Sequence, residues 1–304
     1  MTDPGPPVAP PTDPRATHGA VDLPDPVALA DAWDAAAGVV TRPARVDELA
    51  AAVARFDATW GAGRGPDRTM LQAIAHAGNT VLVAVDAGEA DAPGRADAPG
   101  EADAPGEAQA PADELPVGAA LGFLGWSDGL HLHSHMNAVD PARRGRGIGI
   151  ALKLRQRAIC LANGVDEVRW TYDPLIRRNA HLNLVRLGAE VAAYHPDFYG
   201  DLRDAISGVD RSDRFEVRWR LDAPRVRRAL ARIPAPVWRA DPAVGALALV
   251  ADFEAVRAAS AETAAELRDR SRAAFAEAAR RGLRPELDAS GDYVFTADDP
   301  DREA

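Results

Sequence analysis

One short segment constrains the fold more than any other: a glycine-rich loop between a strand pattern and a helix pattern. Residues 130–139 (LHLHSHMNAV) are typical of a strand, which Asp140-Pro141 ends. The loop RRGRGIG (143–149) follows and opens a helix with an apolar stripe. Backbone N–H groups converge in such a loop, and glycines let a phosphate approach closely. The segment therefore predicts a β-loop-α unit that binds an anion, with charge-assisted contacts from its arginines.

Two common nucleotide loops do not fit this segment. A Walker A loop needs Gly-Lys-Ser/Thr, but Ile150 and Ala151 follow Gly149. A Rossmann fingerprint needs a third glycine where Ile150 stands. What remains is the pattern Arg-x-x-Gly-x-Gly, formed by Arg144, Gly147 and Gly149.

The charge of the chain is concentrated in two segments. The formal net charge is −11, but residues 86–114 hold nine acidic residues against Arg95, and residues 298–304 hold four against Arg302. The remainder is close to neutral, so no basic stripe is available for a nucleic-acid partner. No apolar run is long enough to span a membrane, no signal peptide is indicated, and the single cysteine, Cys160, fits a reducing compartment. We therefore expect a cytoplasmic protein with no membrane partner.

Composition also divides the chain into segments. Residues 1–24 are rich in Pro, Gly and Asp and are predicted to be a disordered arm. Residues 87–113 repeat the motif ADAPG and are predicted to be a disordered acidic insertion in the connection of a β-hairpin. A globular domain is expected over 25–221, followed by a helical extension with a final strand over 222–304.

Hydrophobic periodicity predicts the elements within these segments. Helices are expected at 47–60, 68–77, 149–162, 174–187 and 261–281. Strands are expected at 39–41, 80–85, 117–125, 130–139, 167–171, 191–194, 215–221 and 293–295. Asp173-Pro174 has the form of an N-cap followed by proline at the first helical position.

The string VDPARRGRGIG (139–149) resembles the acyl-CoA pyrophosphate loop of the GNAT superfamily of N-acyltransferases. Further strings resemble a branch of uncharacterised GNAT acetyltransferases: HSHM (133–136), WTYDPL (170–175), RNAHLNLVRLG (178–188), FYG (198–200) and DRFEVRW (213–219). The resemblance covers roughly residues 38–221. It implies an α+β fold (α/β/α layered) in which a mixed, twisted sheet has its fourth and fifth strands splayed around an acyl-CoA.

By position, the resemblance assigns a set of residues to the acyl-CoA. The backbone of the loop would hold the pyrophosphate, the end of the preceding strand would pair with the pantetheine and polarise the thioester carbonyl, and two asparagines would contact the cofactor. The set is Asn137, Ala138, Val139, Arg144, Gly145, Arg146, Gly147, Ile148, Gly149, Asn179 and Asn183. Acetyl-CoA is the default donor, and succinyl-CoA is plausible, with Arg177 or Arg178 meeting its carboxylate.

Proton transfer needs a base for the attacking amine and an acid for the departing thiolate. His131, His133 and His135 alternate along one strand; they serve in packing, metal binding or catalysis, and we favour His135 as general base without a metal. Asp173 is a second candidate base, although a helix-capping role is favoured. Many family members place a tyrosine acid where this chain has Leu184, which leaves Tyr172, Tyr199 or an unassisted thiolate.

Two functions remain open at this point. The first is an N-acyltransferase that moves an acyl group directly from acyl-CoA to the amine of a small molecule or amino acid. The second is a catalytically inactive, GNAT-like module that binds acyl-CoA as a sensor or assembly unit. Cys160 is expected to pack in the core, and Trp170 and Tyr172 either line the acceptor pocket or pack in the core. The extension at 222–304 is a partial second GNAT-like half or a cover on the site, and a homodimer stays open.

Overall fold

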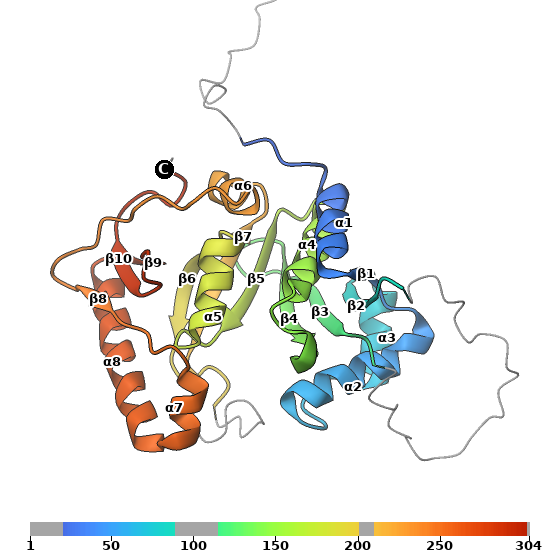
Figure 1. Ribbon diagram of the computed structural model, residues 1–304, viewed down its shortest axis with the longest axis horizontal. Coiled ribbons are helices and arrows are strands. Elements are labelled where there is room, and N and C mark those ends of the chain that lie inside the picture. The colour runs from blue at the N-terminus through green and yellow to red at the C-terminus, as the bar shows by residue number, and fades with distance from the viewer. Residues whose placement is uncertain (1–20, 89–114, 201–209, 303–304) are drawn as a thin grey trace, which may run out of the picture.

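The computed structural model describes residues 21–88, 115–200 and 210–302, and its centre is a seven-stranded sheet (Figure 1). The strand order is β1-β2-β3-β4-β5-β7-β6. The strands are β1 (Val39–Pro43), β2 (Thr80–Asp86), β3 (Gly118–Gly125), β4 (His131–Val139), β5 (Glu167–Tyr172), β6 (Glu190–His195) and β7 (Arg214–Arg220). Neighbours are antiparallel except β4 and β5, which are parallel. The mixed sheet confirms the α+β class, and β2 and β3 form the predicted hairpin.

Helices cover both faces of the β1–β4 half of this sheet. On one face lie α2 (Leu49–Trp60) and α3 (Arg68–His76), which pack on Val81, Leu121 and Met136. On the other face lie α1 (Pro26–Ala37) and α4 (Ile148–Ala162). β3 allows α4 to come close because it has no side chain at Gly118, where an added Cβ would stand 3.1 Å from Ile148 and from Leu152.

The predicted elements are confirmed with two exceptions inside the main domain. Helix α1 is missing from the expectation, although Asp25 caps it and Pro26 occupies its first turn. The helix expected at 174–187 begins later, with α5 (Arg177–Ala180), and continues as the π-helical segment η4 (His181–Arg186). Asp173 accepts from the N–H of Leu175, so it closes a turn ahead of the helix instead of capping the helix itself.

The C-terminal segment is more than a helix and a strand. It contains α6 (Pro224–Leu230), β8 (Ala246–Leu247), α7 (Phe253–Ala259), α8 (Ala261–Arg280), β9 (Arg284–Leu287) and β10 (Tyr293–Thr296). Its strands form a separate three-stranded sheet in the order β8-β10-β9. One continuous apolar core joins this unit to the β5–β7 half of the main sheet, with Phe215, Phe275 and Tyr293 ring to ring.

The predicted arm lies outside the described residues except for its last four, 21–24, and the acidic insertion lies outside them except for residues 87–88. Within the described part, no helix is both long and apolar enough to cross a membrane.

Candidate active site

A V-shaped opening separates β4 from β5 at their C-terminal ends. The two strands pair only at Leu132 with Val168 and at His133 with Arg169. Beyond that point β4 runs on to Val139, while β5 stays paired with β7 up to Tyr172. The edge of β4 that faces β5 therefore has unpaired backbone groups from Ser134 onward, beside the glycine-rich loop.

A β-bulge at His135 marks the start of this opening. Leu121 of β3 pairs with Met136 and Gly122 pairs with Ser134, so His135 is an extra residue in β4. The bulge shifts the alternation of side chains beyond it. Met136 consequently packs with α2 and α3, while Asn137 turns toward α4 and donates to the carbonyl of Gly149 at 3.1 Å. The Oδ1 atom of Asn137 is buried and has no partner among the described residues.

The glycine-rich loop leaves its N–H groups free. No described residue accepts a hydrogen bond from the backbone N–H groups of residues 145–149, at the point where α4 begins. Gly147 has φ +91°, a conformation that side chains disfavour, and an added Cβ would lie 3.6 Å from the ring of Trp33. Asp140 and Arg143 hold the start of the loop in place. Asp140 accepts a hydrogen bond from the N–H of Ala142, and Arg143 binds Asp86 of β2 at 2.8 and 2.9 Å. These free donors can hold an anion.

Positive charge without carboxylate partners surrounds the loop. Arg144 and Arg146 are exposed. Trp33 of α1 lies under two further guanidinium groups, with Arg232 4.8 Å and Arg186 5.7 Å from its ring centroid. None of these four arginines forms an ion pair within the described residues. A concentration of unpaired arginines in an acidic protein favours a ligand that carries several negative charges.

The two predicted asparagines of the following helix differ in their surroundings. Asn183 is buried at 3% exposure, and its Oδ1 accepts from the indole N–H of Trp170 at 3.2 Å. Its position is therefore explained by the core, which argues against the predicted contact with a cofactor. Asn179 is half-buried, and its side chain makes no hydrogen bond with the described residues. Asn179 remains available to a ligand.

The imidazoles gather beside the opening of the V. The rings of His133 and His135 lie 5.9 Å apart, and Phe123 contacts both. Burial, with neighbouring positive charge, lowers the pKa of His133 to about 4, and desolvation also lowers the pKa of the exposed His135. Both rings are therefore neutral at pH 7 and able to accept a proton. Within the described residues, no group of three or more His, Cys, Asp or Glu is placed to hold a metal ion.

Other proton-transfer candidates are engaged in the core. Asp173 receives two hydrogen bonds, at 2.7 and 2.8 Å, from Arg268, which is completely buried. The hydroxyl of Tyr172 is buried against that of Tyr293, and its pKa is raised by desolvation. The structure thus gives Asp173 a turn-closing and ion-pairing role in place of the expected helix cap, and it removes Tyr172 as a free acid. Leu184, where family members carry a tyrosine, is buried in the core.

Polar side chains project from β5 and β7 on the face opposite to the buried residues Phe215 and Val217. The hydroxyls of Thr171 and Tyr199 lie 3.1 Å apart, and Tyr199 is 40% exposed. His195 of β6 contacts Glu216 of β7 at 2.9 Å. Sequence reasoning did not identify the His195–Glu216 pair, because only the register of β6 against β7 brings these residues together.

Lys153 is a further residue that sequence reasoning missed. It is the only lysine in the chain, it is 5% exposed, and its Nζ donates to Ser134 at 2.7 Å. A single lysine in a chain whose other basic residues are arginines is a sequence signal that could have identified it. Periodicity alone shows only that it lies on a turn of α4.

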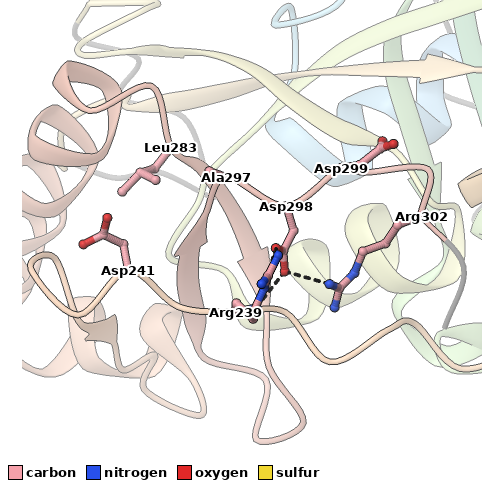
Figure 2. A pocket seen from close by; sticks show the side chains of 7 residues that line it. All are labelled: Arg239, Asp241, Leu283, Ala297, Asp298, Asp299 and Arg302. Carbon is pink, nitrogen blue, oxygen red and sulfur yellow. Dashed lines mark hydrogen bonds and ion pairs between the residues drawn. The ribbon is translucent and has the colours of Figure 1, made fainter.

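A hollow of about 420 Å³ lies elsewhere, within the C-terminal unit (Figure 2). Its lining comes entirely from residues 239–302, and its central carboxylate, Asp298, is occupied by Arg239 and Arg302. It shares no residue with the V or the loop. The arginines offered for succinyl-CoA also face this unit, since Arg177 donates to the carbonyl of Leu249 and Arg178 pairs with Glu254.

Among solved structures, the protein is similar to N-acetyltransferases. Naa20 from Chaetomium thermophilum, in complex with a bisubstrate analogue, is 19% identical, with 65% of this chain and 92% of that chain covered and a TM-score of 0.42. For yncA from Salmonella typhimurium with its cofactor acetyl-CoA, the values are 18%, 61%, 95% and 0.41. For the ribosomal-protein-S18-alanine N-acetyltransferase from Escherichia coli, they are 12%, 60%, 94% and 0.42. No family model and no curated protein matches the sequence.

At such low identities and TM-scores, these likenesses decide nothing about the chemistry, which depends on this chain's own residues. A mixed sheet whose β4 and β5 separate beside a glycine-rich loop is the GNAT arrangement that the sequence resemblance implies. That expectation of fold is confirmed.

Proposed function

We propose that the protein is an acyl-CoA-dependent N-acyltransferase, with acetyl-CoA as the default donor and a small-molecule amine or amino acid as acceptor. The observation that carries the proposal is that two sets of backbone groups without hydrogen-bond partners lie next to each other at one end of the sheet. The free N–H groups of 145–149 can receive a pyrophosphate, and the unpaired edge of β4 can pair with the amides of a pantetheine chain. Acyl-CoA carries both chemical groups in one molecule: its pyrophosphate would lie at the loop, and its pantetheine chain would extend from there along β4.

The remaining assignments follow from this placement. Asn137, with its unpartnered Oδ1, and Asn179 would meet the donor, along with the backbone of Ala138 and Val139. Trp33, Arg186 and Arg232 would surround the phosphate-rich end of the molecule. A backbone N–H at the bulge would polarise the thioester carbonyl, because the bulge turns that group away from the β3 ladder.

His135 would act as the general base, directly or through water. The amine nitrogen attacks the thioester carbon, the C–S bond breaks with its electron pair moving to sulfur, and the proton of the amine passes to the imidazole. The acceptor would lie between this imidazole and the polar groups of Thr171, Tyr199 and Glu216. The carboxylate of Glu216, next to His195, offers a partner for the ammonium form of an amine.

The proposal is tested by following CoA release from acetyl-CoA with a panel of amines, amino acids and short peptides. An enzyme releases CoA only when a suitable amine is present. Binding of acetyl-CoA without release of CoA for any acceptor would instead favour the sensor or assembly module. The buried Leu184, at the position of the family's tyrosine, is the observation that favours this second function. Succinyl-CoA belongs in the same panel, although the engagement of Arg177 and Arg178 elsewhere gives its carboxylate no evident partner.

A further inference from the structure

Lys153 lies across the base of the V. It projects from the second turn of α4, and its Nζ is 2.7 Å from the hydroxyl of Ser134 and 3.8 Å from the ring centroid of Trp170. Ser134 and Trp170 are the residues that directly follow the last pair between β4 and β5. The ammonium group therefore bridges the two strands at the point where they part.

This buried cation has no carboxylate partner among the described residues. Beyond it, Ser134 donates to Gln156 at 2.8 Å, and Gln156 donates to Thr80 at 3.1 Å. Of the three ammonium protons of Lys153, this series of buried polar groups accepts only one, at Ser134. A buried, unpaired charge is costly, so its presence calls for a reason other than packing.

The ionisable groups next to Lys153 come from β4 and α4, and β7 adds a third group that acts on the one from β4. His133 of β4 interacts with it electrostatically, and Glu216 of β7 interacts in turn with His133. Cys160 of α4 is the other titratable neighbour. Burial is the main effect, and it lowers the pKa of Lys153 from 10.5 to about 7. The side chain can therefore exchange a proton in the neutral range, which an ordinary lysine does not.

We propose that Lys153 is the acid that protonates the departing CoA thiolate, in place of the tyrosine that this chain lacks. The inference rests on the proposed function. When the C–S bond breaks, sulfur takes the electron pair, a proton moves from Nζ to sulfur, and the lysine is left as a neutral amine. Water restores that proton before the next turnover. The position at the base of the V suits this step because Ser134 holds Nζ between the strands that would enclose the thioester.

The test uses the fact that Lys153 is the only lysine. Protein labelled with ¹³C and ¹⁵N in lysine gives one side-chain NMR signal, whose titration is followed free, with CoA and with desulfo-CoA, which lacks only the sulfur. We expect CoA to move the titration midpoint by half a unit or more and desulfo-CoA to leave it near that of the free protein. Equal effects of the two ligands overturn the inference alone, whereas binding of neither overturns the proposed function as well.

Kinetics of two variants give a second test. Lys153→Met removes the proton, and Lys153→Arg keeps a charge that does not dissociate in proteins. Both are expected to lower kcat by 10²- to 10⁴-fold with little change in CoA affinity. Both should also lose the fall in rate above pH 7 that we expect of the wild type. Retention of the wild-type rate and alkaline limb in either variant would refute the role. Leu154→Met, at the next position of α4, is the matched control for packing.

Discussion

At the scale of single residues, the proposed chemistry depends on a few side chains whose ionisation is set by burial. His133, His135 and Lys153 all have a lowered pKa, and in each case desolvation is the largest cause. Each group is neutral, or close to losing its proton, at pH 7. The sequence supplied the histidines as candidates, but it could not show that a lone lysine is buried without a carboxylate, since this depends on how α4 lies against β4 and β5.

His135→Gln is expected to lower kcat for acyl transfer by about 10²-fold or more, because a positioned base contributes about that much. Binding of acetyl-CoA, followed by calorimetry, should remain. In the wild type, the rate rises with pH as the imidazole loses its proton, and this limb lies below pH 6.5 because the pKa is lowered. His76→Gln, on α3, is the control. An unchanged rate in His135→Gln would exclude this residue as the base.

Lys153→Met is expected to stabilise the fold at pH 7. The pKa of Lys153 is about 7 in the folded protein, below the ordinary lysine value of 10.5, so the unfolded chain binds more protons between these values. The stability of the wild type therefore rises with pH over this window. Allowing for the lost hydrogen bond to Ser134, the gain at pH 7 is roughly 2 to 4 kcal/mol and shrinks toward pH 10.5. Chemical denaturation at both pH values measures it, and a loss of stability at pH 7 would contradict this account of the lysine.

At the scale of elements, the site is built by departures from regular structure. The loop, the strand before it and the helix after it could be predicted because their glycines and apolar stripe are local signals. The bulge at His135 and the π-helical segment η4 could not, since both arise from pairing and packing with distant residues. The bulge is what separates the directions of Met136 and Asn137 and places Asn137 against α4.

Helix α1 brings the aromatic ring of Trp33 to the loop, and Arg186 and Arg232, from later segments, lie over that ring, which has a measurable consequence. Arg232→Ala should weaken binding of CoA by about 10-fold, because a charge-assisted contact to phosphate contributes roughly 1.5 kcal/mol or more. Dephospho-CoA, which lacks the 3′-phosphate, should show a smaller loss if Arg232 contacts that group. Arg270→Ala, an exposed arginine of α8, serves as the control. Equal affinity of wild type and Arg232→Ala for CoA would show that the cluster on Trp33 is not part of the donor site.

At the scale of the whole molecule, the C-terminal unit contacts the end of β5 and so holds one side of the opening in place. Arg268 of α8 binds Asp173, directly after β5, and also Asp210, while Tyr293 of β10 meets Tyr172. The sequence predicted α8 and β10 but not the small sheet, because β8 and β9 are short and carry weak patterns. These contacts support β5, and they do not place the unit as a cover over the opening.

Arg268→Met tests this support. Removing the guanidinium leaves the carboxylate of Asp173 without its buried partner, which costs about 3 to 5 kcal/mol. Arg178→Ala, which breaks an exposed pair with Glu254, should cost less than about 1 kcal/mol. Urea denaturation of both variants makes the comparison. Similar losses in the two would mean that the C-terminal unit does not hold the end of β5 in place.

The central claim is that the loop at Gly147 binds acyl-CoA, and calorimetry with acetyl-CoA tests it most directly. Two substitutions at positions of positive φ are compared: Gly147→Ala (φ +91°) in the loop and Gly164→Ala (φ +71°) at the far end of α4. An added Cβ meets Trp33 in the first and open space in the second. We expect wild type and Gly164→Ala to bind alike and Gly147→Ala to lose at least 10-fold in affinity. Absence of binding to the wild type, or equal binding by all three proteins, would contradict the claim.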